Sequence, residues 1–215
     1  MDVLNFNNLS KFKNVVHGIS TKKFGTMKNE DGSVNIKNLS AFLNSLGLEN
    51  VPVLMKQVHG GNIEGVKDAQ KSPIENTDGL VTDQKSISLV VFTADCLPIL
   101  FYDSKNKVIG IAHAGRKGLQ VRIIKNIIEK FKGMYKSDPL DIIVGVGPGI
   151  EKTCYEVDDE FMDLRKIAND QLLTEGILEQ NIENIDLCTK CNSDLFYSYR
   201  GRDKTERFAG IISLI

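Results

Sequence analysis

The sequence predicts an α+β fold in which mixed β-sheets are flanked by helices. Short apolar, β-branched runs that are typical of buried strands recur along the chain, and longer segments with helical spacing lie among them. These segments do not follow the strict strand–helix alternation of parallel α/β folds, which favours the α+β class. Because no linker rich in Pro, Gly or Ser interrupts the 215 residues, we expect one domain over residues 1–215.

Predicted strands occupy two segments in the first half of the chain. Residues 51–58 are apolar and β-branched, and we expect a strand that ends at His59. Residues 87–93 form a short continuous apolar run, which indicates a buried strand. Asp78 lies between the two segments and is interpreted as a turn residue or as part of a pocket wall.

The next two segments predict a β-hairpin. Residues 97–102 and 108–112 are apolar, and the turn-like residues 105–107 lie between them. Such a hairpin would return His113 to the end of the sheet that carries Cys96. We therefore expect these two side chains to meet.

A long amphipathic helix is predicted over residues 117–134, where most apolar residues recur at three- and four-residue spacing. It would begin directly after Gly115, so its free amides and the positive end of its dipole would face the region of His113. Residues 140–146 predict another buried strand. The Gly-rich turn after that strand lacks the pattern of a nucleotide-binding loop, and we expect it to shape a wall of the pocket.

The last third of the chain predicts a helix over residues 157–169, with Asp158 and Asp159 in its first turn, and a closing strand over residues 208–214. Cys188 and Cys191 form a lone Cys-x-x-Cys, whereas a zinc ribbon needs a second such pair. We interpret the motif as the start of a helix over residues 192–200, capped by Thr189. Cys154 is interpreted as structural in the same way.

Composition excludes several classes of protein. The hydrophobic content of 41% and the charged content of 26% are ordinary for a globular protein, and the formal net charge of −1 gives no basic field for nucleic acid. No apolar run approaches the ~20 residues of a membrane span, and the first residues lack the pattern of a signal peptide. We expect a cytoplasmic protein that binds neither nucleic acid nor membrane, either a monomer or a homodimer.

His59, Cys96 and His113 are the candidate functional residues. Each histidine closes an apolar run and is soon followed by glycine, and Cys96 lies between two such runs. Two imidazoles and one thiolate suit Zn²⁺, and three protein ligands leave the open fourth position that is typical of a catalytic site. A buried structural cysteine and two hydrogen-bonded histidines remain an alternative interpretation.

Several stretches, spread over nearly the whole chain, resemble one widespread bacterial family. These stretches are His17-Gly18-Ile19-Ser20-Thr21, Gln57-Val58-His59-Gly60, Thr93-Ala94-Asp95-Cys96-Leu97-Pro98, Ile111-Ala112-His113-Ala114-Gly115, Gly147-Pro148-Gly149-Ile150, Cys154-Tyr155-Glu156-Val157 and Phe196-Tyr197-Ser198-Tyr199-Arg200. The family was once described as multicopper polyphenol oxidase, or laccase-domain, proteins. Its members are now described as purine nucleoside phosphorylases, with the peptidoglycan-editing factor as a relative.

The resemblance implies a zinc ion on His59, Cys96 and His113, and layers of helix, sheet, sheet and helix. The sequence departs from the family after Gly115, where Arg116-Lys117-Gly118 replaces the usual Trp-Arg-Gly. The segment that ends at Asn35 resembles the family's Ser-Leu-Asn, but the loop after it is short. These departures bear on substrate contacts rather than on the metal ligands.

The implied function is zinc-dependent phosphorolysis of purine nucleosides, with deamination of adenosine by the same centre. Zinc lowers the pKa of a bound water to about 7, which suits attack on a purine carbon that carries an amino group. Phosphorolysis also needs cationic contacts to phosphate. Candidates for substrate binding are Asn35, Asp95, Arg116 and Lys117, with Gln57, Lys22 and Arg200 as further possibilities.

Three other functions are weighed against this one. A cysteine hydrolase acting on a peptidoglycan precursor would use Cys96 as nucleophile and His113 as base, without metal. A copper-dependent polyphenol oxidase would need a trinuclear cluster with many more histidines than the three in the chain, which makes copper the weaker choice of metal. A non-catalytic zinc module would have no open coordination position beside a cleft.

Overall fold

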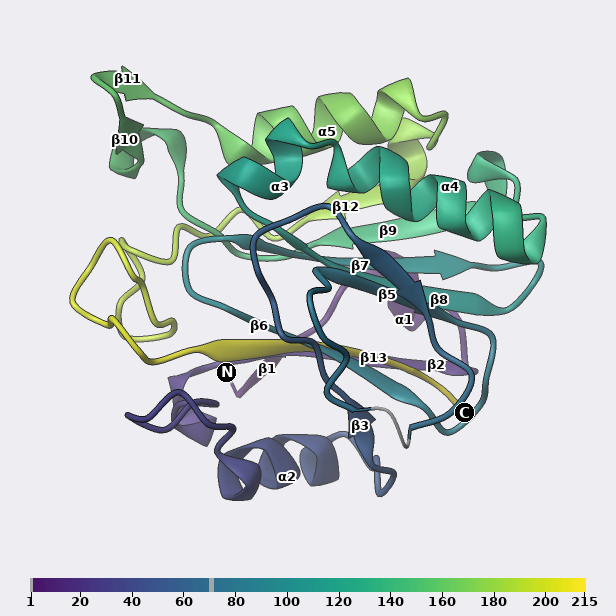
Figure 1. Cartoon of the computed structure of the whole chain (residues 1–215), viewed down its shortest axis with the longest axis horizontal. Helices are drawn as coiled ribbons and strands as arrows, with labels where there is room; N and C mark the ends of the chain where they lie inside the picture. Colours follow the sequence, from purple (N-terminus) through teal and green to yellow (C-terminus); the bar gives the residue numbers. More distant parts are fainter. Residues whose placement is uncertain (1, 70–71) are drawn as a thin grey trace.

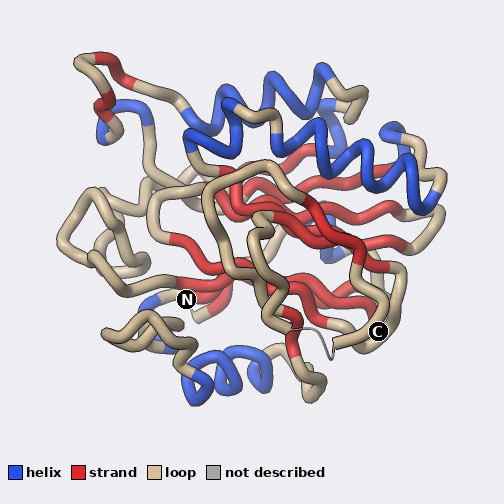
Figure 2. The backbone as a smooth tube through the Cα atoms, in the orientation of Figure 1, coloured by secondary structure: helices blue, strands red, loops and turns tan. Residues whose placement is uncertain are grey.

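The computed structural model describes residues 2–69 and 72–215 and shows two β-sheets stacked face to face between helices. Figure 1 and the tube in Figure 2 show the layers in the order helix, sheet, sheet, helix. The predicted α+β class with mixed sheets is therefore confirmed, and the four layers expected from the family resemblance are present.

The first sheet has five strands in the order β1-β2-β13-β6-β3. Its middle strands are antiparallel, and β3 adds to β6 in parallel at one edge. The strand bounds are Val3–Leu4 (β1), Val15–Ser20 (β2), Phe208–Leu214 (β13), Ser88–Thr93 (β6) and Pro52–Val53 (β3). The predicted strands 87–93 and 208–214 correspond to β6 and β13 and are confirmed.

The second sheet has six strands in the order β12-β9-β7-β8-β5-β4. The predicted hairpin is its centre: β7 and β8 are antiparallel, and Asp103 pairs with Val108 beside the turn. The strand bounds are Ile182–Asn184 (β12), Ile142–Val146 (β9), Leu97–Asp103 (β7), Val108–Ala114 (β8), Gly79–Thr82 (β5) and Ile63–Gly65 (β4). A separate small hairpin pairs Glu156–Val157 (β10) with Glu160–Phe161 (β11).

Helices cover the outer faces of both sheets (Figure 1). Helices α3 (Arg116–Gln120), α4 (Ile123–Tyr135) and α5 (Leu164–Thr174) lie over the six-stranded sheet, and α2 (Ile36–Ser45) lies over the five-stranded sheet. The short α1 (Asn7–Ser10) lies beside β9, because the Asn8 side chain donates to the Val144 carbonyl. Among the described residues, no helix is both long and apolar enough to cross a membrane.

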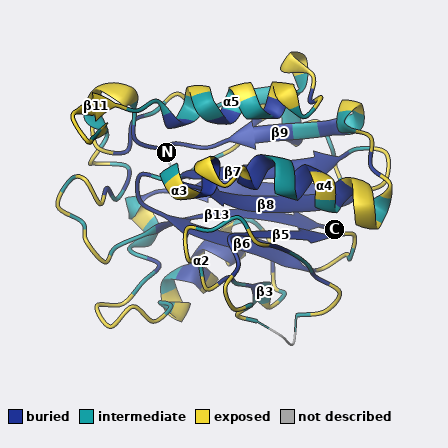
Figure 3. Ribbon diagram, turned by 45° about the horizontal axis from the view of Figure 1, so that its top comes forward, coloured by how far each residue is buried: buried dark blue, intermediate teal, exposed yellow. Residues whose placement is uncertain are grey.

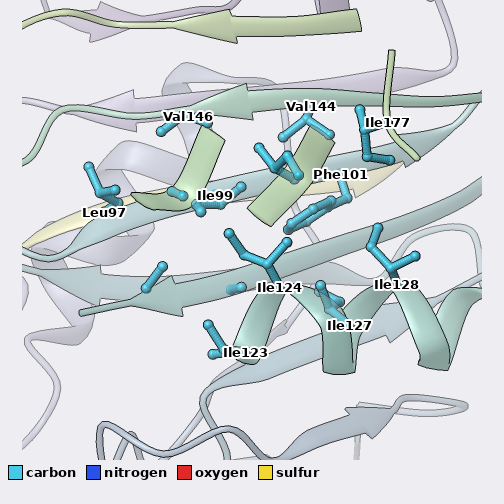
Figure 4. Close-up of a cluster of buried hydrophobic side chains, with 14 of the residues drawn as sticks. Leu97, Ile99, Phe101, Ile123, Ile124, Ile127, Ile128, Val144, Val146 and Ile177 are labelled. Atoms are coloured by element: carbon cyan, nitrogen blue, oxygen red, sulfur yellow. The ribbon is translucent and has the colours of Figure 1, made fainter. Parts of the chain in front are cut away.

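Alternating side chains of the strands fill three apolar layers. In β6, Leu89 and Val91 pack between the two sheets, whereas Val90 and Phe92 pack under α2. The third layer joins the six-stranded sheet to its helices, where Ile124 and Ile127 of α4 point toward the sheet (Figure 4). Figure 3 shows the same division, with buried strands in the middle and exposed residues on the outer helix faces. This two-residue alternation fixes which strand residues reach each layer.

The strand expected over residues 51–58 is wrong, because only Pro52–Val53 pair with β6. Beyond them the Gln57 side chain bonds the backbone of Phe92: its Nε2 donates to the Phe92 carbonyl at 2.8 Å, and its Oε1 accepts from the Phe92 amide at 3.0 Å. The Gln57 side chain therefore makes the hydrogen bonds to β6 that the backbone of a paired strand would make. The backbone of this segment leaves the sheet and turns toward His59.

The single helix expected over residues 117–134 is also wrong, because it breaks into α3 and α4 at Arg122, which adopts a left-handed conformation with φ of 58°. Contacts with distant segments fix the chain on either side of the break, one to the backbone of α3 and one from a side chain of α4. Gln171 donates to the Leu119 carbonyl at 2.9 Å, and Asn126 donates to the Gly61 carbonyl at 2.8 Å. Hydrophobic spacing does not reveal contacts of this kind.

The helix expected over residues 157–169 begins only at Leu164, where the Asp163 side chain accepts from the Lys166 amide. Asp158 and Asp159 instead form the turn of the β10–β11 hairpin, with φ of 51° and 64°. Two successive left-handed residues make a tight hairpin turn, and Asp tolerates that conformation better than most residues. The acidic pair therefore marked a turn rather than a helix start.

His17 lies in β2, with 3% of its surface exposed, and its Nε2 accepts a hydrogen bond from the Phe6 amide at 2.9 Å. Burial lowers the pKa of His17 from 6.5 to about 4. The unfolded chain therefore takes up a proton near pH 6.5, whereas the folded chain does so only near pH 4, and acid favours the unfolded state between these values.

We expect the His17 pKa shift to cost about 3 kcal/mol of unfolding free energy as the pH falls from 6.5 to 4. His17→Gln keeps an acceptor for the Phe6 amide but does not titrate, so its stability should fall less steeply over the same range. Urea unfolding of both proteins at several pH values measures the difference. Parallel pH profiles would contradict the assignment.

Candidate active site

His59, Cys96 and His113 converge at one end of the two sheets. His59 lies in the loop after β3, Cys96 in the turn between β6 and β7, and His113 in β8, where it pairs with Pro98 of β7. One ligand atom from each side chain lies within 4.8 Å of the others, and the two imidazole rings are 4.7 Å apart. The expected meeting of Cys96 and His113 is confirmed, and His59 joins them from the loop that follows β3, the edge strand of the five-stranded sheet.

The backbone around the three side chains is specialised for this approach. His59 and Asp95 adopt positive φ angles of 60° and 87°. Gly115 is required for a different reason, since a Cβ atom there would lie 2.6 Å from the Cys96 sulfur. Gly115, two residues after His113, is therefore needed because the backbone passes close to the Cys96 sulfur, and not because the loop is flexible.

Asp78, directly before β5, organises the site from behind. It is fully buried, and its Oδ1 accepts from His113 Nδ1 and from the His59 amide, both at 2.9 Å. Its Oδ2 accepts from the amides of Gly60 at 2.8 Å and Val58 at 3.1 Å. One carboxylate thus fixes the His113 ring and the loop that carries His59. The sequence indicated only a turn residue or a pocket wall here.

The pKa values of Cys96 and His113 are shifted in opposite directions by their contact. Burial alone would raise the pKa of Cys96, but the charges and hydrogen bonds of His113 and His59 lower it to about 6. Burial would likewise lower the pKa of His113, whereas the Cys96 thiolate and Asp78 raise it to about 9. Burial would raise the pKa of Asp78, but the hydrogen bonds that it accepts from His113 and from the amides of the His59 loop outweigh burial and lower this pKa.

The three side chains fit a tetrahedral metal ion. A zinc ion with bonds of about 2.0–2.3 Å brings its ligand atoms to roughly 3.5 Å from one another, and the three candidate atoms already lie within 4.8 Å. Asp78 occupies Nδ1 of His113, which leaves Nε2 for a metal, as in the carboxylate–histidine–zinc arrangement. The lowered pKa of Cys96 favours the thiolate that metal binding requires.

A cleft of about 910 Å³ opens above these side chains. Its walls are strongly cationic, and Asp95 is the one carboxylate among the described residues that line it. The cations on the walls are Lys28, Lys56, Arg116, Lys117, Arg200 and Arg207. The cleft also has aromatic walls, formed by Phe92, Tyr155 and Tyr199. Such a cleft suits a flat apolar group joined to an anion.

The structure separates the predicted substrate residues into three groups. Arg116 and Lys117 line the cleft at the start of α3. Asp95 also lines it, but Oδ1 accepts from the Thr189 hydroxyl at 2.7 Å and Oδ2 from the Arg200 amide at 2.6 Å. Asn35 caps α2, where its side chain accepts from the Asn38 amide, and it does not line the cleft.

Two further expectations need correction here. Residues 192–200 form turns rather than a helix, and Thr189 binds Asp95 instead of capping a helix. A five-residue α3 also replaces the long helix expected after Gly115, so the dipole contribution is smaller than that helix would supply. The hydroxyl of Thr189 finds a buried carboxylate far away in the sequence, which local capping patterns cannot anticipate.

Lys28 and Arg207 line the cleft but were missed from the sequence. Lys28 lies 5.2 Å from the centre of the Phe92 ring, and Arg200 lies 5.1 Å from that of Tyr155. Lys22, by contrast, pairs with Asp203 at 3.4 Å and does not line the cleft. Scattered single cations carry no local signal, because only the fold gathers them.

Comparison with known proteins places the chain among its relatives. The sequence profile of the family described as multi-copper polyphenol oxidoreductase laccase matches residues 16–163 and 161–215. Purine nucleoside phosphorylase YlmD of Bacillus subtilis is 26% identical over 94% of this chain and 89% of its own length. A purine nucleoside phosphorylase of Clostridium acetobutylicum is 32% identical over 85% of this chain and 84% of its own length.

Solved structures show the same architecture. YlmD from Geobacillus stearothermophilus superposes with a TM-score of 0.91 at 25% identity, covering 100% of this chain and 96% of its own. The Bacillus licheniformis protein YfiH gives a TM-score of 0.88 at 26% identity. With the profile covering nearly the whole chain, the protein belongs to the multi-copper polyphenol oxidoreductase laccase family.

Proposed function

We propose that the chain, acting as a single domain, is a zinc-dependent purine nucleoside phosphorylase that also deaminates adenosine. The observation that carries this proposal is the His59–Cys96–His113 cluster at the base of a cleft whose walls are both aromatic and cationic. The names of the relatives support the same reaction, because they act on purine nucleosides by phosphorolysis. The proposed substrates are adenosine, inosine or guanosine together with phosphate.

The protein groups divide the work of the site. His59, Cys96 and His113 would hold the zinc ion, which when bound supplies a Lewis acid and an activated water. Asp78 keeps a hydrogen on Nδ1 of His113 and holds the His59 loop, so the two imidazoles keep their orientation. Gly115 leaves room for the Cys96 sulfur.

The cleft walls would bind the two substrates, the purine nucleoside and phosphate. Phe92, Tyr155 and Tyr199 offer surfaces for a purine ring, and the cations offer charge for phosphate. Arg116 and Lys117 come directly after Gly115, which touches Cys96, so they lie closest in sequence to the cluster. Deamination consumes water rather than phosphate, and it would need the same cluster but not these cations.

Arg116 and Lys117 provide the mutational test of phosphate binding. In Arg116→Ala/Lys117→Ala we expect the apparent KM for phosphate, measured with inosine, to rise by about one to two decades. A charge-assisted hydrogen bond contributes roughly 1.5–3 kcal/mol, which accounts for a change of this size. Adenosine deamination by the same variant should be nearly unchanged. Both rates are measured with and without phosphate.

A matched control removes two positive charges from the exposed side of α4. Lys125 and Lys132 do not line the cleft, so Lys125→Ala/Lys132→Ala should keep the phosphate constant of the wild type. Equal loss of both reactions in the Arg116/Lys117 variant would show that these residues hold the fold or the nucleoside. No loss in either would move the phosphate site toward Arg200, Lys28 and Arg207.

One observation favours a second candidate function, a cysteine hydrolase acting on a peptidoglycan precursor. Cys96, His113 and Asp78 follow one another as nucleophile, base and orienting carboxylate do in a catalytic triad. His59 has no role in such a triad, whereas it completes a metal site. Turnover that survives complete removal of metal would favour the hydrolase.

The chain's remaining histidine, His17, is buried in β2, so no trinuclear copper cluster can form.

A further inference from the structure

We propose that Cys154, Cys188 and Cys191 form a second metal site, which binds one Zn²⁺ through three thiolates and is distinct from the cluster at the base of the cleft. The three sulfurs lie within 4.8 Å of one another, and those of Cys154 and Cys191 are 3.3 Å apart. Tetrahedral zinc with Zn–S bonds of about 2.3 Å places its sulfur ligands roughly 3.8 Å apart. The Cys154–Cys191 separation is slightly shorter than that value, and the 4.8 Å limit on all three pairs is compatible with it.

The fold brings the third cysteine to a pair that looks isolated in the sequence. Cys154 ends a 3₁₀ turn at Lys152–Cys154, and the segment just before that turn pairs in parallel with the Cys-x-x-Cys loop through Gly149 and Cys188. The Gly149 amide donates to the Leu187 carbonyl at 3.3 Å, and the Thr189 amide donates to the Gly149 carbonyl at 3.1 Å. These bonds fix both loops beside each other before any ion binds.

The chemistry of the three sulfurs suits a thiolate-bound cation. The backbone amides of Glu151, Lys190 and Cys191 are directed at the Cys188 sulfur. Amides directed at the first cysteine of a Cys-x-x-Cys stabilise the thiolate form that binds metal. Cys188 is buried, whereas Cys191 is exposed, so a water can complete the coordination from the solvent side.

A disulfide between Cys154 and Cys191 is the competing explanation. It would use two of the three sulfurs and leave Cys188, with the amides around it, without a role. A metal ion accounts for all three. The thiols lie on two loops that pair through their backbones, an arrangement that a single ion bridges directly.

The proposed ion would brace one wall of the cleft. Thr189, between the two cysteines, donates to Asp95, and the Arg200 amide donates to the same carboxylate. Asp95 precedes Cys96, and Tyr199 and Arg200 line the cleft. Holding Cys188 and Cys191 to Cys154 would therefore fix the loop that presents these two side chains. The site is structural, and it takes no part in the bond-breaking step.

Zinc counting on purified, reduced protein separates the two sites. We expect about two equivalents in the wild type and about one in Cys191→Ser, which loses only the second site. Cys96→Ser should also hold about one, and the double variant none. Lys190→Ala changes an exposed neighbour that offers no ligand, and it should keep both equivalents. Cys191 is chosen because its side chain is exposed, so we expect the fold to tolerate serine at this position. Thermal unfolding of the variant checks that it is folded.

Two further measurements test the identity of the second site. In Cys96→Ser, cobalt substitution should still give the strong near-ultraviolet absorption of sulfur-to-metal charge transfer, and the additional Cys191→Ser change should remove most of it. After chelation without reductant, denatured wild type should show all four thiols. Two missing thiols would establish the disulfide instead. A wild type with the same zinc content as Cys191→Ser would also overturn the proposal, even if the phosphorylase function holds.

Discussion

Cys96→Ala is expected to lose both the zinc of the cleft and all measurable turnover of purine nucleosides. Cys96 supplies the one thiolate of the His59–Cys96–His113 cluster, and His113 and His59 lower its pKa to about 6. Loss of a direct ligand must exceed the roughly 10–100-fold loss that follows removal of a ligand's hydrogen-bond partner. Both phosphorolysis and deamination should fail together, because both depend on the same ion.

Elemental analysis and turnover assays on the same preparation check this expectation. Thr93→Ser is a matched control, because Thr93 ends β6 just before the turn and its hydroxyl donates to the Cys96 carbonyl, a bond that serine can keep. The control should retain both zinc and activity. If Cys96→Ala holds as much zinc as the wild type, the ligand assignment is wrong, whatever its activity.

Asp78→Asn is expected to weaken zinc binding in the cleft by about 10–100-fold, the range typical for a ligand's hydrogen-bond partner. Asp78 accepts four hydrogen bonds, from His113 Nδ1 and the amides of Val58, His59 and Gly60. All four partners of Asp78 are N–H donors. In Asp78→Asn the NH₂ group cannot accept their hydrogen bonds, so the partners on that side of the carboxamide would be left unpaired. The His59 loop or the His113 ring must then move out of place.

Competition with a chelator of known affinity measures this change, and circular dichroism confirms that the variant is folded. Asp83→Asn serves as the control, since Asp83 is an exposed acid at the end of the same strand and touches neither histidine. A folded Asp78→Asn with wild-type zinc affinity would show that the carboxylate does not support the metal. Zinc affinity is the deciding readout, because activity alone could fall for other reasons.

Local pattern predicted the elements whose partners lie nearby in the sequence. The hairpin of β7 and β8 needs only two apolar runs and a turn, and its register brings His113 back beside Cys96. The strand of residues 208–214 is fixed by its apolar run alone. Errors came where a distant group replaced a local one, as when Gln57 bonded the backbone of Phe92 and the chain left the sheet.

The candidate ligands His59, Cys96 and His113 could be named from the sequence because each stands in a distinctive short context. Their support could not be named. Asp78 looks like an ordinary turn residue until folding removes it from water, and only then must its oxygens find the amides and the imidazole around them.

The sequence by itself determined the α+β class, the central hairpin and the residue types that can bind a metal. Tertiary structure alone decided the role of Asp78, the cationic wall with Lys28 and Arg207, and the meeting of Cys154 with Cys188 and Cys191. Hydrophobic periodicity records which face of an element is buried, and it depends only on neighbours along the chain. A polar or charged side chain carries no such period, so its partner is chosen only when the folded chain places two distant segments side by side.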